Sequence, residues 1–171
     1  MRSARVMVVP YDDAWGAAFE SIKKEIENAV GDLIIGVEHV GSTAVVGMSA
    51  KPCIDIDVII GDYSVFPAVV ARLATVGYLH EGDLGIKDRE AFKYNDKPHL
   101  MAHHLYVCPQ YSSELRRHTA FRDFLRQNAI AAQKYSAVKE KAAALFPNDI
   151  DQYIAYKTPC IEELYMQCGL K

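Results

Sequence analysis

Two aspartates, Asp55 and Asp57, alternate with aliphatic residues in the run Ile54 to Ile60, a spacing that could support metal-dependent chemistry. Because side chains alternate between the two faces of a strand, both aspartates would point to one face and the aliphatic residues to the other. Two carboxylates side by side in apolar surroundings repel each other and lose hydration unless a cation lies between them. Mg²⁺ takes oxygen ligands of this kind. We therefore predict that both aspartates are catalytic metal ligands on a central strand. The alternatives are a solvated pair on an edge strand or a pair of salt-bridged carboxylates.

A glycine–serine turn, Gly41-Ser42-Thr43, precedes these aspartates in the chain. Glycine frees the backbone, and backbone amides beside a serine hydroxyl can hold a phosphate. Ser42 or Thr43 could also cap a short following helix, and the two roles are compatible because phosphates bind at helix N-termini. Lys51, at the entrance to the aspartate strand, is either a solvated loop residue or a ligand of a triphosphate. We predict that all four residues bind phosphate.

This Gly-Ser turn and Asp-x-Asp strand resemble the signature of the polymerase-β-type nucleotidyltransferase superfamily. Within it, the chain from about Val9 to about Glu163 is similar to the GrpB family, also called UPF0157. The matching residues are Val9-Pro10-Tyr11-Asp12, Trp15, Glu38-His39-Val40-Gly41-Ser42-Thr43-Ala44-Val45, Gly47, Ala50-Lys51-Pro52, Asp55-Ile56, Arg89, Phe92-Lys93, His103-His104-Leu105, Arg117-His118, Phe121-Arg122-Asp123-Phe124-Leu125, Tyr135, Lys139 and Tyr156-Lys157.

The resemblance implies an α/β (α+β) fold, a nucleotidyltransferase-like mixed β-sheet with flanking helices and a C-terminal helical extension. It also implies that Mg²⁺ on the aspartates and the Gly-Ser turn meet the phosphates of a nucleotide. Family members occur fused to dephospho-coenzyme A kinase, which points to coenzyme A or nucleotide metabolism. Two positions depart from the family pattern: Val46 replaces a proline, and Tyr106 replaces a histidine.

No acidic residue occupies the position of the third carboxylate that the superfamily usually carries on a later strand. In the predicted strand Leu100 to Val107, His104 and Tyr106 share one face. Imidazole is a poor ligand of Mg²⁺ but can act as a base or bind phosphate, so we predict that His104 is catalytic. Glu90 on the partner strand is an alternative third acid.

Further cations stand in positions that could meet phosphate. Arg89 and Lys93 lie four residues apart on one predicted strand and hence on one face, and we predict that both bind phosphate. The group Arg117, His118 and Arg122 opens the helical part and could close over a ligand or face water. Tyr135, Lys139 and Lys157 are ambiguous: the tyrosine fits the apolar stripe of a helix, and the lysines fit either solvent or a ligand.

Local patterns predict the elements that position these residues. An amphipathic helix starts near Asp12 or Asp13 and ends at Gly31, strands span 33–40 and 53–60, and a helix spans 66–76. The segment 81–107 reads as a β-meander with a turn at 95–98, and Val6 to Val9 as a short β-rich run. From Ser113 the pattern is helical, with a break at 147–149 and a kink or restart at Thr158-Pro159. We expect an α/β core over 1–110 and a helical part over 111–171, packed as one unit.

The whole chain has the composition of an ordinary globular protein. It has 171 residues, 50% of them hydrophobic, and a net charge of −3, which gives no general attraction to nucleic acid or to an anionic membrane. No apolar run approaches the roughly 20 residues that span a bilayer. Its four cysteines show no zinc-type spacing and are expected to be reduced thiols in a cytoplasmic protein.

These observations favour a Mg²⁺-dependent nucleotidyltransferase that uses a nucleoside triphosphate and a small-molecule acceptor of unknown identity. We expect the acceptor between the sheet and the C-terminal helices. Three alternatives stay open: a non-catalytic module that binds nucleotide or coenzyme A, a protein-interaction module, and a phosphate-ester hydrolase. We expect neither a membrane nor a nucleic-acid partner, and a homodimer remains open.

Overall fold

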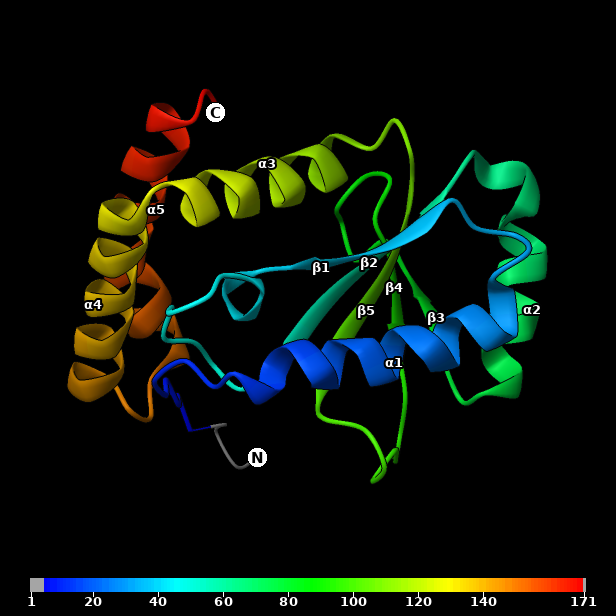
Figure 1. Cartoon of the computed structure of the whole chain (residues 1–171), viewed down its shortest axis with the longest axis horizontal. Helices are drawn as coiled ribbons and strands as arrows, with labels where there is room; N and C mark the ends of the chain where they lie inside the picture. Colours follow the sequence, from blue (N-terminus) through cyan, green and yellow to red (C-terminus); the bar gives the residue numbers. More distant parts are fainter. Residues whose placement is uncertain (1–4, 171) are drawn as a thin grey trace.

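The computed structural model describes residues 5–170 and contains one five-stranded mixed sheet flanked by helices (Figure 1). The described elements are α1 Ala14–Val30, β1 Gly36–Val40, the 3-10 helix η1 Ser42–Ala44, β2 Ile54–Ile60, the 3-10 helix η2 Tyr63–Val65, α2 Phe66–Thr75, β3 Leu79–Gly82, β4 Glu90–Lys93, β5 His103–Pro109, α3 Ser113–Gln127, α4 Ala129–Leu145 and α5 Ile150–Gln167.

The strand order is β1-β2-β5-β4-β3. β2 pairs antiparallel with β1 and parallel with β5, and the remaining pairs are antiparallel. β2 therefore lies between two neighbours, which confirms the prediction that both aspartates stand on a central strand. The mixed sheet, its flanking helices and the C-terminal helices also agree with the predicted fold class.

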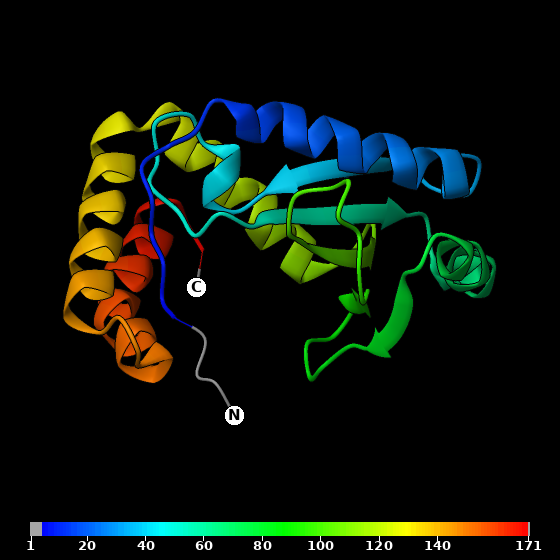
Figure 2. The same ribbon diagram turned by 90° about the horizontal axis from the view of Figure 1, so that it is seen from below.

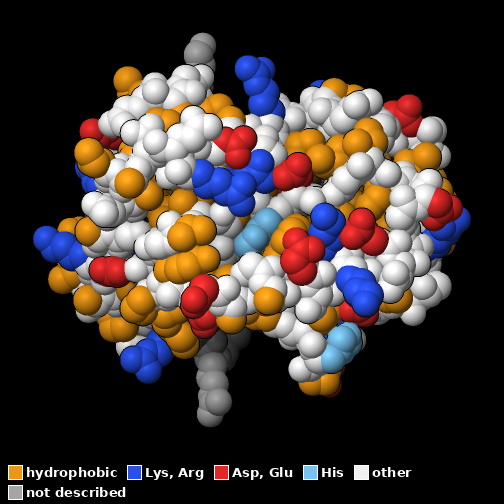
Figure 3. Space-filling view, viewed as in Figure 1, with side chains coloured by type: hydrophobic (Ala, Val, Ile, Leu, Met, Phe, Trp, Pro, Cys, Tyr) orange, Lys and Arg blue, Asp and Glu red, His pale blue; other side chains and the backbone are white. Residues whose placement is uncertain are grey.

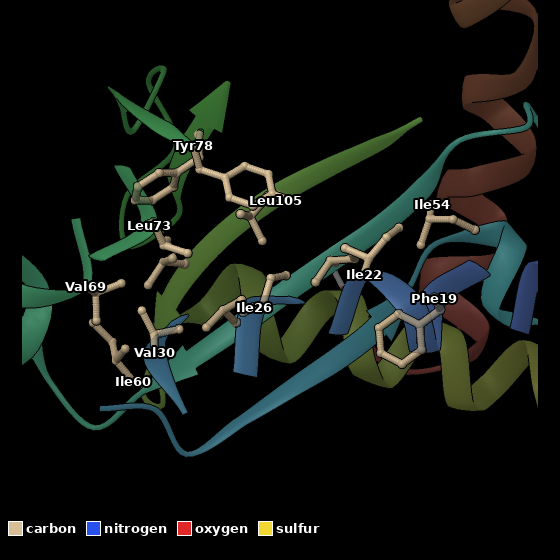
Figure 4. Close-up of a cluster of buried hydrophobic side chains, with 14 of the residues drawn as sticks. Phe19, Ile22, Ile26, Val30, Ile54, Ile60, Val69, Leu73, Tyr78 and Leu105 are labelled. Atoms are coloured by element: carbon tan, nitrogen blue, oxygen red, sulfur yellow. The ribbon is translucent and has the colours of Figure 1, made fainter. Parts of the chain in front are cut away.

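One face of the sheet packs against α1 and α2. The predicted stripe of α1 is buried as expected from its helical spacing, and Ile22, Ile26 and Val30 are fully buried. Figure 4 shows these side chains directed toward the sheet, with Leu73 of α2 beside them. Burying one such side chain contributes about 2 kcal/mol to folding, so this layer holds the inner face of β2 in place.

The opposite face, which carries the aspartates, is crossed by α3. Nη1 of Arg122 on α3 donates to Oε2 of Glu38 (2.6 Å) and to the carbonyl of His39 (3.0 Å), both on β1. Across one end of the sheet stand α4 and α5 (Figure 2). Their apolar side chains enclose Val45 and Met48 from the loop after η1. The glycine–serine turn is thus held against the C-terminal helices.

Several predicted boundaries change in the structure. β1 begins at Gly36 rather than Leu33, because the amide of Leu33 bonds back to the carbonyl of Val30 in a turn after α1 (2.8 Å). In the predicted β-rich run at the N-terminus, Val9 makes an isolated bridge to Ala50. β5 begins at His103, and the meander has a third, short strand, β3, which starts at Leu79, before residue 81.

α5 runs through Pro159 without a restart. The hydroxyl of Thr158 donates to the carbonyl of Ile154 (2.6 Å), a bond within the turn that the proline disturbs. Among residues 5–170, no helix is both long and apolar enough to cross a bilayer.

Candidate functional site

β2 presents Asp55 and Asp57 on the face that α3 crosses. In the strand register, Asp55 stands beside His104 of β5, and Asp57 stands between Glu38 of β1 and Tyr106 of β5. The side chain of Asp55 is 36% exposed, whereas that of Asp57 is 0% exposed. A ligand can therefore touch Asp55 from solvent and reaches Asp57 only by entering the site.

Gly41 allows the turn before η1 to approach this carboxylate pair. Its φ is +76°, in the left-handed region that favours glycine, and a Cβ placed there would lie 2.5 Å from Oδ2 of Asp55. Neither Ser42 nor Thr43 caps η1 with its side chain, so the capping alternative is wrong. Instead, Nζ of Lys139 donates to Oγ of Ser42 (2.7 Å), and Oγ1 of Thr43 bonds Nε2 of His39 (2.9 Å).

Two histidines hold the two carboxylates. Nδ1 of His104 donates to Oδ1 of Asp55 (3.0 Å), and Nδ1 of His118 on α3 donates to Oδ2 of Asp57 (2.6 Å). The other ring nitrogen of His118 lies 3.2 Å from Oε1 of Glu114. Within the described part of the chain, Oδ1 of Asp57 is buried and has no hydrogen-bond partner.

The protonation of these groups follows from their surroundings. Burial raises the pKa of Asp57, and the hydrogen bond from His118 opposes it. For His118, burial acts to lower the pKa, but the hydrogen bond and the charge of Asp57 outweigh it and the pKa is raised. The hydrogen bonds to Asp55 and Cys53 raise the pKa of His104 to about 10. His104 is therefore a cation at neutral pH, and the carboxylate of Asp57 favours the charged form of His118.

A cavity of about 320 Å³ opens above Asp55, between the sheet and the C-terminal helices. Its wall carries Ser42, Lys51, Arg117, Lys139 and Lys157, together with aromatic rings from α3, α4 and α5. We call it the first cavity. Arg122 also lines it but is paired with Glu38 and Asp123. The other four basic side chains can neutralise several negative charges, as a triphosphate requires.

Lys139 is the most deeply buried of these cations. Burial, followed by the nearby charge of Lys157, lowers the pKa of Lys139 to about 7. Burial also lowers the pKa of Lys157 itself. Both amines lie over tyrosine rings, Lys139 at 4.5 Å from the centroid of Tyr135 and Lys157 at 4.8 Å from that of Tyr153. An anion in the first cavity would stabilise both charges.

The remaining predicted phosphate ligands divide between two further cavities. Arg89 directly precedes β4, lies 4.4 Å over the ring of Tyr106 and lines a third cavity of about 180 Å³ with Asp55 and His118. Its Nε is buried without a partner in the described residues. Lys93 instead lines a second cavity, to which Lys51 also contributes. The two cations share a face, as predicted, but not a cavity.

The structure removes Glu90 as a third acid. Glu90 pairs with Val107, so it points away from Asp57, and it bonds Tyr63 and His80. Across residues 5–170, no three acidic, histidine or cysteine side chains converge as a metal cluster. The position beside the aspartate pair on β5 is therefore taken by His104 and Tyr106.

Three residues gain a role that sequence reasoning left open: His118, Lys139 and Lys157. His118 and Lys139 lie far along the chain from their hydrogen-bond partners, 61 residues for His118 and Asp57 and 97 for Lys139 and Ser42. The available signal was their match to the GrpB pattern, which names the positions without their contacts.

Comparison with solved structures defines the class of fold. The GLD-2/RNP-8 complex superposes with a TM-score of 0.57 at 14% identity, over 78% of this chain and 55% of that chain. The Cid1 poly(U) polymerase with bound MgGTP gives 0.52 at 9% identity, over 77% and 43%. The chain therefore has a nucleotidyltransferase-like fold.

The family assignment rests on closer matches. The GrpB family model, described as GrpB protein, matches residues 5–167, and this chain belongs to the GrpB family. The crystal structure of conserved protein GrpB from Enterococcus faecalis superposes with a TM-score of 0.79 at 29% identity, over 94% of this chain and 98% of that chain. Glutamate-rich protein GrpB of Alkalihalophilus pseudofirmus is 29% identical over 96% of both chains.

Two longer relatives contain a similar region. The UPF0157 protein YqkA of Bacillus subtilis is 30% identical over 158 residues, which are 92% of this chain and 46% of YqkA. A dephospho-CoA kinase of Mycolicibacterium paratuberculosis is 27% identical over 95% of this chain and 46% of its own length. This chain thus spans about half the length of these two relatives.

The donor atoms at β2 fit Mg²⁺. Asp55 and Asp57 supply carboxylate oxygens on one face, and the buried, unpartnered Oδ1 of Asp57 is an acceptor that a cation would satisfy. Mg²⁺ is commonly held by one or two carboxylates together with substrate phosphates, so a third protein acid is not required for binding.

Proposed function

We propose that this protein is a Mg²⁺-dependent nucleotidyltransferase that uses a nucleoside triphosphate. The observation that carries the proposal is the joining, in one cavity, of a β2 carboxylate, the Gly41–Ser42 turn and buried lysines from α4 and α5. This arrangement pairs a metal site with a polyanion site on a nucleotidyltransferase-like fold.

The residues of the first cavity have distinct binding tasks in this proposal. Lys139, Lys157 and Ser42 bind the β- and γ-phosphates, because a buried and a half-buried amine gain most from an anion. Aromatic rings on α5 pack against the nucleoside. Arg117, which lies 5.6 Å from the ring of Tyr165, closes the opening.

Asp55 and Asp57 would hold Mg²⁺, which when bound supplies charge neutralisation at the transferred phosphoryl group. His118 orients Asp57 through its 2.6 Å hydrogen bond, and His104 orients Asp55. Gly41 keeps the turn close enough for a phosphate to contact both the turn and Asp55.

The transfer step itself is a displacement at phosphorus. An acceptor oxygen forms a bond to the α-phosphorus while the bond to the bridging oxygen of the β-phosphate breaks. Pyrophosphate leaves with that electron pair, and the acceptor's proton passes to water. The residues of this chain position both partners for this displacement.

A non-catalytic module that binds nucleotide or coenzyme A is the second candidate. It is favoured by one observation, that imidazoles engage both carboxylates and occupy the position of a third acid. The similarity to part of a dephospho-CoA kinase supports coenzyme A as a ligand to test.

A small acceptor fits the surface better than a long nucleic acid does. On the face shown in Figure 3, basic side chains (blue) are interspersed with acidic ones (red) rather than joined in a band. The net charge of −3 agrees with this pattern. A polynucleotide is held mainly through extended basic surfaces, so we propose a small-molecule acceptor.

The experiment measures thermal stability with each nucleoside triphosphate and with coenzyme A, with and without Mg²⁺. A ligand at one hundred times its dissociation constant adds about 2.7 kcal/mol to the unfolding free energy. We expect a Mg²⁺-dependent gain in the wild type that Asp57→Asn loses and that the exposed control Asp96→Asn keeps.

Release of pyrophosphate from the stabilising nucleotide then separates the two candidates. Turnover that Asp57→Asn abolishes supports the transferase. Binding without turnover, across a panel of phosphorylated and hydroxylated acceptors, favours the binding module. Indifference to every nucleotide refutes the transferase, and indifference to coenzyme A as well refutes both candidates.

A further inference from the structure

A second cavity of about 520 Å³ adjoins the first one. The two cavities share Lys51, Cys53 and His104 as common wall. His104 is also the residue that bonds Asp55, which lines the first cavity, so Asp55 stands beside the junction. A molecule in the second cavity could extend an atom to the site where a nucleotide in the first cavity would react.

The second cavity lies where β2 and β5 begin and β4 ends. Lys93, next to Phe92 on β4, points to the aspartate face, because Phe92 pairs with Leu105 on the other face and side chains alternate. The N-terminal segment, blue in Figure 2, contributes Arg5 and Met7 to the outer wall. Elements distant in the sequence therefore build this space.

The charges of the second cavity are unbalanced. Besides His104, which is paired with Asp55, three cations, Arg5, Lys51 and Lys93, face a single acid, Glu81. In the described part of the chain, neither Lys51 nor Lys93 forms a salt bridge with a carboxylate. Cations without protein counter-ions, grouped in a cavity of ligand size, favour an anionic occupant.

Apolar atoms line the rest of the space. Met7, Pro52, Phe92 and Tyr94 all contribute to the wall. The occupant therefore combines an anionic group with a carbon body. A phosphate monoester matches three cations better than a carboxylate does, because it carries about −1.5 to −2 charges at pH 7 and has three acceptor oxygens.

We propose that the second cavity binds the acceptor, and that the acceptor is a small molecule bearing a phosphate monoester and a free hydroxyl. The inference rests on the proposed nucleotidyl transfer. The phosphate binds Arg5, Lys51 and Lys93, and the hydroxyl reaches the His104–Asp55 junction. There its oxygen bonds to the α-phosphorus, pyrophosphate leaves with the electron pair of the broken bond, and the hydroxyl proton passes to water.

This placement differs from the expectation that the acceptor lies beneath the C-terminal helices. That space is the first cavity, whose buried lysines suit the triphosphate. The second cavity approaches the carboxylate pair from the β4 side, so the donor and the acceptor do not compete for volume.

The test maps binding by the backbone amide signals in ¹H–¹⁵N NMR spectra of the full chain. The probes are ribose 5-phosphate, glycerol 3-phosphate and inorganic phosphate, with ribose and glycerol as matched compounds that lack the phosphate. Each is titrated with and without Mg²⁺ and a saturating α,β-methylene analogue of the nucleotide that stabilises the protein. Lys93→Glu is compared with Lys24→Glu, an exposed position on α1 outside the cavity.

We expect at least one phosphate ester to shift the amides of Lys51, Lys93 and His104 even when the nucleotide analogue is bound, and ribose and glycerol to shift none of them. Lys93→Glu should weaken this binding by about tenfold or more, because it reverses one of three charges. Lys24→Glu should leave the affinity within about twofold.

The inference is overturned if no phosphate ester shifts these amides, if the shifts fall on Ser42 and Lys139 instead, or if both variants bind equally. Failure of the proposed function gives a different result. In that case the nucleotide analogue with Mg²⁺ leaves the amides of Ser42 and Lys139 unchanged, whatever the phosphate esters do.

Discussion

Replacing Lys139 with methionine tests the reasoning about the first cavity most directly. The residue is 3% exposed, and burial followed by the charge of Lys157 lowers its pKa from 10.5 to about 7. At 1.36 kcal/mol for each pH unit, this lowering corresponds to about 5 kcal/mol of charge-burial cost. We treat that value as an upper bound, since buried sites relax. We expect Lys139→Met to raise the unfolding free energy at pH 7 by about 2–5 kcal/mol.

The direction in which the unfolding free energy changes with pH follows from proton binding. Between pH 7 and 10.5 the unfolded chain keeps its proton on Lys139, while the folded chain releases it, so the unfolded state binds more protons. The unfolding free energy of the wild type therefore rises through this window relative to Lys139→Met, which has no such group. At pH 7 the variant should be the more stable protein, and its advantage should fall toward zero near pH 10.5.

Urea unfolding at half-unit intervals from pH 6 to pH 10.5 measures this difference. Lys141→Met, an exposed lysine on the same helix, is the control and should show a difference from the wild type that does not change with pH. A constant difference for Lys139→Met across the range would refute the assignment of a buried, destabilised charge.

Nucleotide binding should raise the pKa of Lys139 again. A triphosphate beside Lys139 favours the charged amine, so nucleotide binding at pH 8 should take up close to one proton, measurable by calorimetry in buffers of different ionisation enthalpy. Lys139→Met should bind nucleotide weakly and lose this uptake. Tight binding by the variant with unchanged proton uptake would contradict the triphosphate assignment.

Three further changes test other parts of the structure. Gly41→Ala should lower the unfolding free energy by about 1–2 kcal/mol because of the positive φ, and it should also weaken Mg²⁺–nucleotide binding, because its Cβ would meet Oδ2 of Asp55 at 2.5 Å. The control Gly47→Ala, with φ +86° and open space around the Cβ, should show the stability loss alone. Equal losses of binding in both variants would argue against the contact. Ile26→Ala should lower the unfolding free energy in urea by about 2–5 kcal/mol, because the side chain is fully buried, and a loss below about 1 kcal/mol would contradict the packing of α1. Arg122→Ala should lower the unfolding free energy by about 2 kcal/mol and Arg122→Lys by less, because the guanidinium joins α3 to two acceptors on β1. Hydrogen exchange of the β1 amides should be faster in the alanine variant. Unchanged exchange would show that other contacts hold α3.

The parts of this fold that follow from short-range periodicity could be predicted. The apolar stripe of α1 needs only its own spacing, and the alternation around Asp55 needs only the geometry of a strand. The edge strand β3 was misplaced for the opposite reason. Most of its residues are exposed, so no alternation of apolar side chains marks it.

The residues of the site likewise divide into those that local sequence predicts and those that depend on tertiary packing. Asp55, Asp57 and the glycine turn are close in the chain, and their residue types alone predict a metal beside a phosphate. Local chemistry also accounts for the positive φ of Gly41. The partners of these residues are not local: whether His118 meets Asp57 depends on the course of α3 across the sheet.

The amino-acid sequence thus determines the strand that carries the carboxylates, the turn that faces them and the family to which the chain belongs. Tertiary structure decides which cation each oxygen meets, because that depends on how α3, α4 and α5 pack around the sheet. It also buries Lys139 beside Ser42 and separates Lys93 from Arg89 into different cavities. The pKa of a lysine and the charge of a cavity are properties of that packing, since both depend on which groups the folded chain removes from water.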